Sequence, residues 1–155
     1  MEAPGRGPHR VFMRTGTTLL ELLTAVVLLG VLSGLAVPAL TRHRDRAVVL
    51  VARERVVGLI GAARRLGYER GSATLRFEAV DARAILFSGA DTLQDVRLGP
   101  GLDGPAMRLG NDREELELNF DGLGLGRFAS TTIRLRRGDE QAAVVVSSYG
   151  RVRRR

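Results

Sequence analysis

The chain has 155 residues, a formal net charge of +7 and no cysteine. The lack of cysteine excludes a disulfide framework, a thiolate metal site and a cysteine nucleophile. Its two histidines, His9 and His43, have no histidine partners near them for a metal site or an acid–base pair, and all other basic residues are arginine. The length allows one membrane segment and one modest domain.

The charge is divided into blocks along the chain. Residues 42–70 carry eight arginines against three acids, and residues 127–155 carry eight arginines against two acids. Residues 71–126 carry five arginines against ten acids. The basic blocks favour polyanions or acidic surfaces as partners, although arginine also fills solvated faces in an arginine-rich protein.

An apolar run near the start predicts a membrane span. Residues 22–40 are 19 almost entirely apolar positions without a charge, and a helix of that length spans roughly 29 Å, about one hydrocarbon core. Glu21 lies directly before the run, where a carboxylate is costly unless it is paired. A secretory signal peptide has its small-residue cleavage site after the apolar region, whereas Gly16 precedes it.

This N-terminal pattern resembles the class III signal of type IV prepilins. The resemblance rests on Gly16, Glu21 five residues later and the long apolar helix that follows. It implies that a membrane prepilin peptidase cuts after Gly16 and methylates the new N-terminus at Thr17, where the family usually has phenylalanine. It also implies that Glu21 attracts the N-terminal amine of a neighbouring subunit during assembly. Pro38 stands where many pilins have a helix-kinking proline.

The resemblance implies a domain organisation and a location. Residues 1–16 form a cleaved leader, residues 17–41 a transmembrane helix, and residues 42–155 a periplasmic domain. Leader arginines favour a cytoplasmic leader, although Arg42, Arg44 and Arg46 compete with them at the other end of the span. The expected protein is a single-pass protein of the inner membrane, with prepilin peptidase and other pilin or pseudopilin subunits as partners.

Beyond the span, the apolar periodicity predicts an α+β domain. Apolar residues at three- and four-residue spacing continue the helix to Leu66, with Gly67 or Gly71 as its end. From Ser72 the period changes to two, which predicts an antiparallel sheet with the long helix packed on it, as in a pilin. The expected strands cover residues 74–79, 84–88, 93–98, 116–120, 131–137 and 142–148.

The last third resembles the globular domain shared by type II secretion pseudopilin H and the FimT-like minor pilins. The resemblance rests on Phe120 and Gly122, a β-hairpin, a valine-rich strand and the Gly-Arg-x-Arg sequence at residues 150–153. It implies a minor pseudopilin, a structural subunit of the filament that exports proteins in type II secretion. The alternative is a FimT-like minor pilin of a type IV pilus that binds DNA during uptake through Arg151, Arg153, Arg154 and Arg155.

Other interpretations are weaker. An ordinary single-span protein would explain the apolar run without the glycine and glutamate ahead of it. Arg134, Arg136 and Arg137 would extend a DNA-binding patch if a hairpin brings them to one edge, but no aromatic residue lies among the terminal arginines to stack on bases. Because glycines 122, 124 and 126 precede no helix, they do not indicate a nucleotide site. We therefore predict no enzyme activity and no cofactor.

Overall fold

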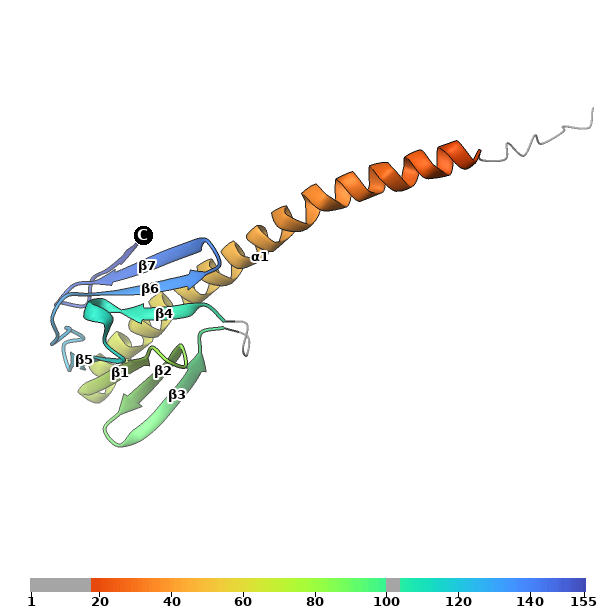
Figure 1. The fold of residues 1–155 in the computed structure, drawn as a ribbon. Coiled ribbons are helices and arrows are strands. Elements are labelled where there is room, and N and C mark those ends of the chain that lie inside the picture. The colour runs from red at the N-terminus through yellow and green to blue at the C-terminus, as the bar shows by residue number, and fades with distance from the viewer. Residues whose placement is uncertain (1–17, 100–103) are drawn as a thin grey trace, which may run out of the picture. The chain divides into compact units, whose positions relative to one another are not determined.

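The computed structural model describes residues 18–99 and 104–155, and it contains one long helix followed by eight strands (Figure 1). The chain divides into two compact units, Met1–Pro38 and Ala39–Arg155. The elements in chain order are α1 (Leu19–Arg70), β1 (Ser72–Glu78), β2 (Arg83–Ser88), β3 (Asp91–Arg97), β4 (Ala106–Leu109), a 3₁₀ turn (Gly110–Asp112), β5 (Glu115–Asp121), β6 (Thr131–Arg137), β7 (Glu140–Val146) and β8 (Val152–Arg154).

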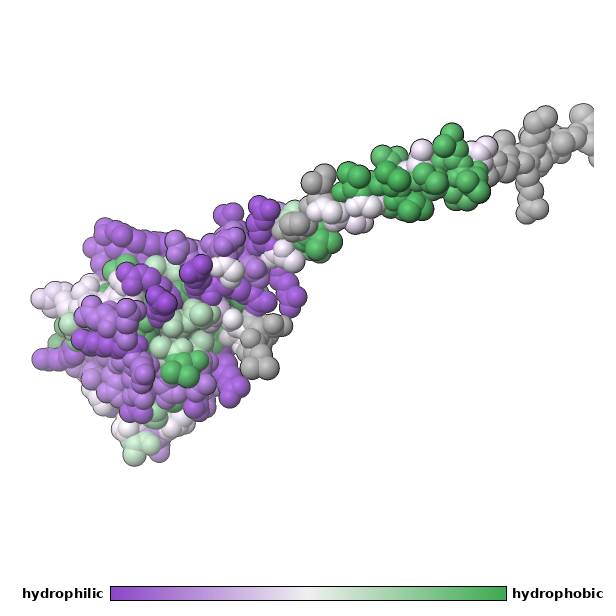
Figure 2. Space-filling view, viewed as in Figure 1, coloured by the Kyte–Doolittle hydropathy of each residue, from purple (hydrophilic) through white to green (hydrophobic). Residues whose placement is uncertain are grey.

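Helix α1 contributes to both units. In the first unit its large apolar side chains are exposed, with 56 to 81% of each one accessible where the structure describes it. Figure 2 shows them as a continuous hydrophobic stretch of the helix, while hydrophilic side chains cover most of the visible face of the second unit. By length and composition, α1 meets the requirements for crossing a membrane.

In the second unit, α1 buries one stripe against the sheets. The stripe has three- and four-residue spacing, as the sequence predicts, and consists of Val49, Ala52, Val56, Leu59, Ile60 and Ala63. The helix ends at Arg70 because Gly71 has a φ of 86°, a left-handed conformation that stops helices and favours glycine. Of the two predicted ends, Gly71 is therefore the correct one.

The strands form two antiparallel four-stranded sheets. Sheet A has the order β3-β2-β1-β5, and sheet B has the order β4-β6-β7-β8. In β1, β5, β6 and β7, alternate side chains are buried, and together with the stripe of α1 they make one hydrophobic core. The expected architecture of a long N-terminal helix on antiparallel β structure is confirmed.

Two features of the strand arrangement differ from the sequence-based expectation. The strands belong to two sheets, whereas the periodicity predicts one, because local alternation does not encode which strands pair. Strand β8 was not predicted, because its three residues are too few to show a period. Strand β4 was also not predicted, since its four residues lie between turn signals and were too few to show a period. It pairs with β6 at the edge of sheet B.

Candidate assembly and anion-binding sites

The first turn of α1 contains the predicted assembly residue, Glu21. Thr18 precedes the helix, and its side-chain oxygen accepts a hydrogen bond from the Glu21 backbone N–H at 3.2 Å. Thr18 and Glu21 have the Thr-x-x-Glu spacing of a capping box, in which the first residue satisfies a free N–H of the helix start. Over residues 18–99 and 104–155, the Glu21 carboxylate has no ion-pair partner and is exposed.

The other predicted positions near the N-terminus are Gly16, Thr17 and Pro38. Gly16 and Thr17, the predicted cleavage and methylation positions, lie outside the described residues. Pro38 lies inside α1, which continues through it to Arg70, and it also ends the first compact unit. A bend at Pro38 stays a prediction.

Strand register separates the four C-terminal arginines. The short strand β8 pairs with β7, so that Arg153 lies opposite Val145 and Arg154 opposite Val144. Arg155 continues this pairing, since its backbone N–H and carbonyl both bond to Ala143 at 2.8 and 2.7 Å. Val144 faces the core, so Arg154 lies on the inner side of the strand while Arg153 and Arg155 lie on the outer side.

Arg154 binds a carboxylate of α1. Its Nε donates to Glu54 Oε2 at 3.1 Å, and Arg53 Nη2 donates to Glu54 Oε1 at 2.9 Å. These hydrogen bonds, that of Arg53 first, hold the pKa of Glu54 below its ordinary value of 4.5. Arg154 therefore helps to attach β8 to the helix, and it does not share a surface with Arg153 and Arg155.

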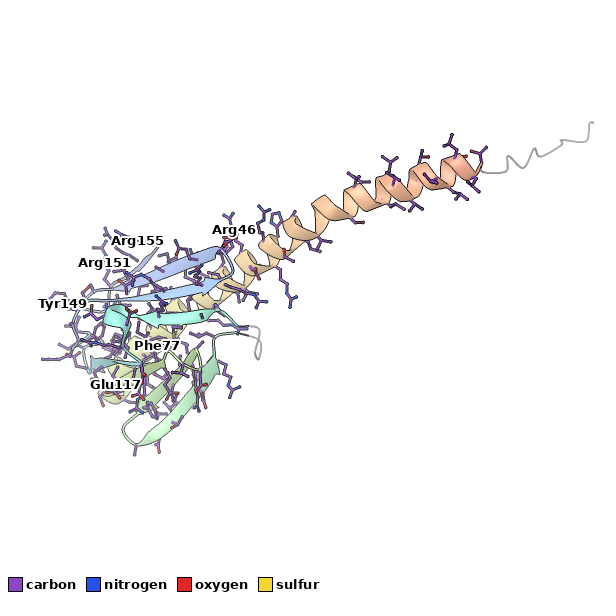
Figure 3. All side chains as sticks on the ribbon, in the orientation of Figure 1. Arg46, Phe77, Glu117, Tyr149, Arg151 and Arg155 are labelled. Carbon is purple, nitrogen blue, oxygen red and sulfur yellow. The ribbon has the colours of Figure 1, made fainter. Side chains whose placement is uncertain are left out.

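Arg151 lies before β8, at the end of a tight turn. Its backbone N–H donates to Ser147 Oγ at 3.1 Å, and the Ser147 N–H donates to the Arg151 carbonyl at 2.9 Å. Figure 3 shows Arg151 and Tyr149 toward one end of sheet B and Arg155 nearer to Arg46 of α1. Tyr149, two residues before Arg151 in the chain, is 72% exposed.

The outer side of sheet B carries five exposed arginines from three strands. We name this surface the arginine face and define it by Arg108 of β4, Arg134 and Arg136 of β6, Arg153 of β8, and Arg155. Arg134 and Arg136 belong to the patch that the sequence analysis considered. The sequence analysis does not include Arg108 in this patch because it does not predict β4.

Arg137, the third arginine considered on β6, lies on the inner side. Its Nε donates to Asp45 Oδ1 of α1 at 2.6 Å, and both side chains are partly buried. The hairpin turn between β6 and β7 sits beside the same aspartate. A Cβ added at Gly138 would lie 3.0 Å from Asp45 Oδ2, and the φ of 56° at Gly138 also favours glycine. The hairpin is thus fixed to α1 at Asp45.

The glycine-rich loop after β5 is held by its own aspartate. Asp121 Oδ1 accepts hydrogen bonds from the backbone N–H groups of Leu123 and Leu125, both at 3.0 Å, and Oδ2 accepts one from Arg127 Nε at 3.0 Å. The Leu125 backbone bond is the main cause that lowers the pKa of Asp121 below its ordinary range. These bonds give Asp121 a structural role in the loop.

No group of three or more histidine, aspartate or glutamate side chains able to hold a metal ion occurs in the part of the chain that the structure describes. The acids Glu114, Glu115 and Glu117 are exposed, and the side chains of Glu115 and Glu117 alternate with buried residues of β5.

These elements together define a pilin-like fold: a long N-terminal helix, apolar in its first part, whose second part packs on antiparallel strands. The structure is similar to that of the type IV minor pilin FimU from Pseudomonas aeruginosa strain PAO1 in two crystal forms. For one form the TM-score is 0.57 at 14% identity, covering 72% of this chain and 90% of FimU. For the other it is 0.50 at 15% identity, covering 67% and 90%. No protein-family model and no curated protein matches the chain.

Proposed function

We propose that the chain is a minor, structural subunit of a pilin-like filament, stored in the membrane through the first part of α1 before assembly. The observation that carries this proposal is Glu21, an exposed carboxylate without an ion-pair partner in the described chain, in the first turn of α1, where the helix is apolar and exposed. In an apolar environment such a carboxylate needs a cation. The new N-terminal amine at Thr17 of a neighbouring subunit would supply it.

The fold supports this proposal. In FimU, a minor pilin of type IV pili by its name, a similar fold serves a pilus. For this chain we propose a filament of a type II secretion system or a type IV pilus in the inner membrane, with the C-terminal unit in the periplasm. Processing by prepilin peptidase after Gly16 and methylation of Thr17 belong to the same proposal.

The capping box offers a different explanation of Glu21, and one substitution separates the two. Gln serves at the third helical position of a capping box as Glu does, but it carries no charge. We expect Glu21→Gln to insert into the membrane normally and to be lost from the filament fraction by about tenfold or more, because one unpaired amine in an apolar interior costs over 1.4 kcal/mol.

The measurement is the amount of the chain in sheared or purified filaments relative to its amount in membranes. Glu69→Gln, which neutralises an exposed acid near the other end of α1, is the matched control and should assemble as the wild type does. If Glu21→Gln assembles as well as the control, Glu21 is only a capping residue and our account of assembly is wrong.

DNA binding by the arginine-rich C-terminus is the second candidate function. It is favoured by the exposure of Arg151, Arg153 and Arg155, and by the exposed ring of Tyr149, two residues before Arg151, which can stack on an unpaired base. We expect the full chain in uncharged detergent micelles to bind duplex DNA at low salt. Replacement of these three arginines by glutamine should weaken binding at least tenfold and reduce its salt dependence.

Arg154 supplies an internal control for this candidate. Because its side chain bonds to Glu54, Arg154→Gln should change DNA affinity much less than any outward-facing replacement. A gel-shift titration at two salt concentrations measures both effects. Equal losses from Arg154→Gln and Arg153→Gln would show that binding does not follow the strand register, and this candidate would be rejected.

A further inference from the structure

The arginine face has no acidic side chain to balance it. Between its arginines, the outer side of sheet B presents Ala106, Thr132, Gln141, Ala143 and Val145. In the described chain none of the five arginines of the face forms an ion pair, and Arg136 donates only to the Gly138 carbonyl, at 3.0 Å. The face is therefore a concentration of positive charge whose counter-charge must come from outside the sheet.

On the strands of sheet A, two of the three arginines are balanced by acids, whereas Arg97 lies directly opposite Arg83 and has no ion pair in the described chain. Arg76 lies directly opposite Glu117 and bonds to it at 2.7 Å, and Arg83 Nε bonds to Asp95 at 2.6 Å. On sheet B, Arg108 lies directly opposite Arg134, a like-charge pair that weakens strand pairing. Since the same chain balances Arg76 and Arg83 with acids on sheet A, composition alone does not explain why all five arginines of the arginine face lack ion pairs.

The arginines surround a hollow. It has a volume of about 550 Å³ and is lined by Arg108, Arg134, Arg136, Gln141 and Arg155, among others. Ala143 of β7 lies between Arg134 of β6 and Arg155, so its small side chain leaves space between two guanidinium groups. Planar guanidinium groups around an open space favour the oxygens of phosphate groups.

The face begins next to the end of the apolar run. The β6–β7 hairpin is fixed to Asp45, which is only five residues beyond Leu40, or roughly 7.5 Å along the helix. Phosphate headgroups occupy a layer of roughly this depth outside the hydrocarbon core. Arg42, Arg44 and Arg46 are also exposed on this segment of α1. Arg46 and Arg155 line one further hollow together.

The acidic residues near the β6–β7 hairpin do not neutralise the positive charge of the arginines there. Asp45 is engaged by Arg137, and Glu140 lines the same hollow as Arg46, Arg53 and Arg155. Asp139 is exposed at the hairpin turn. In the described chain, Asp45, Asp139 and Glu140 thus stand against Arg42, Arg44, Arg46, Arg136 and Arg137 around the hairpin, so this part of the unit carries a net positive charge.

We propose that the arginine face and the basic segment 42–46 bind the phosphate groups of anionic membrane lipids, so that the second unit rests on the headgroup layer while the chain is stored in the membrane. The proposal uses the membrane span of the proposed function, but not cleavage, filament assembly or DNA. It holds whichever leaflet adjoins the C-terminal end of the span. Each basic residue near an anionic surface contributes about 1 kcal/mol.

The test measures how close the β6–β7 hairpin lies to the lipids. Since the chain has no cysteine, a single fluorophore can be placed at the hairpin by Asp139→Cys. The labelled full chain is reconstituted into nanodiscs of phosphatidylcholine with or without roughly 30 mol % phosphatidylglycerol. Quenching of the fluorophore by a nitroxide on the lipid headgroup reports the fraction of protein that is docked. All variants carry the same label.

A second label provides the positional control. Leu123 is 72% exposed in the loop that contacts Arg64 of α1, roughly 28 Å along the helix from Asp45. We expect phosphatidylglycerol to increase quenching at residue 139 and to leave residue 123 nearly unchanged. About 0.5 M salt should reverse the increase, because it shortens the range of exposed charge interactions to a few ångströms.

Two pairs of substitutions test whether docking on the lipids depends on the arginine face. Arg134→Gln with Arg155→Gln should lower the ratio of docked to undocked protein roughly thirtyfold. Arg55→Gln with Arg65→Gln removes the same charge from exposed positions of α1 and should have little effect. Circular dichroism identifies any variant that fails to fold, and Arg108→Gln with Arg153→Gln then replaces it.

Three results would overturn the proposal. The first is equal quenching at residue 139 in charged and uncharged nanodiscs, and the second is an equal loss from the two pairs of variants. The third is a change in the fluorescence of the label at residue 139 that duplex DNA induces in uncharged nanodiscs, while phosphatidylglycerol has no effect on it. That last result would assign the face to nucleic acid.

Discussion

At the residue scale, strand register decides the role of each arginine. Consecutive residues of β8 point to opposite sides, so Arg154 meets Glu54 of α1 while Arg153 and Arg155 face outward. The same alternation on β6 directs Arg137 to Asp45 and leaves Arg134 and Arg136 on the arginine face. A run of arginines in the sequence therefore serves both the attachment of strands to the helix and a surface.

Hydrogen bonds and ion pairs that lower the pKa values of carboxylates should make the folded protein less stable at acidic pH. The folded pKa of Glu54 lies below its unfolded value of 4.5, and those of Asp95 and Asp121 lie below 3.8. The stabilisation from each carboxylate is therefore fully present above its unfolded pKa and is lost as the pH falls through the lower, folded pKa. We expect the thermal midpoint to be nearly constant from neutral pH to about pH 5 and then to fall.

Circular dichroism melts over this range measure the effect. Glu54→Gln removes one of the three contributions, so the variant should start from a lower midpoint and lose less of it on acidification. A midpoint that rises as the pH drops below 4.5 would show that Glu54, Asp95 and Asp121 have raised pKa values instead.

At the element scale, α1 packs closely on sheet A near its C-terminal end. A Cβ at Gly67 would lie 2.9 Å from the Asp121 carbonyl oxygen and 3.1 Å from Phe120 Cβ. Part of this obstruction is backbone, so it cannot move aside as a flexible side chain would. Gly67 thus permits the contact between the helix and β5, whereas Gly71 ends the helix.

Gly67→Ala should destabilise the fold by roughly 1–3 kcal/mol, because the added methyl group forces α1 and β5 apart. Gly61→Ala is the matched control, since Gly61 is also a helical glycine but has no atom within 4 Å of its added Cβ. It should stabilise by about 0.5–1 kcal/mol through helix propensity.

Urea titrations of both variants in uncharged detergent give the two free energies of unfolding. Opposite signs are expected. If both alanines stabilise the protein, the approach of α1 to β5 is looser than the structure has it.

At the scale of the whole molecule, the sequence predicted what local periodicity encodes. The stripe of α1, the turn glycines and the strands β1, β2, β3, β5, β6 and β7 all follow from residue spacing. Division into two sheets did not follow, because pairing joins residues far apart in the chain, such as Leu75 with Leu118.

The candidate sites show the same limit. The alternation of β6 and the terminal arginines were visible in the sequence, but their combination with Arg108 depends on the pairing of β4 with β6. Likewise, the bond between Arg154 and Glu54 spans 100 positions in the chain. Residue types and spacing indicated basic surfaces, and only the strand register shows which arginines share one.

The central claim is that the chain is processed and assembled as a pilin-like subunit, and intact-mass spectrometry of the chain from membranes tests it most directly. The chain is produced with active prepilin peptidase and, in parallel, with an inactive one. With the active peptidase we expect loss of residues 1–16, so that the mature protein begins at Thr17; Gly16→Val should prevent this loss. A chain that keeps its first 16 residues beside an active peptidase would contradict the account.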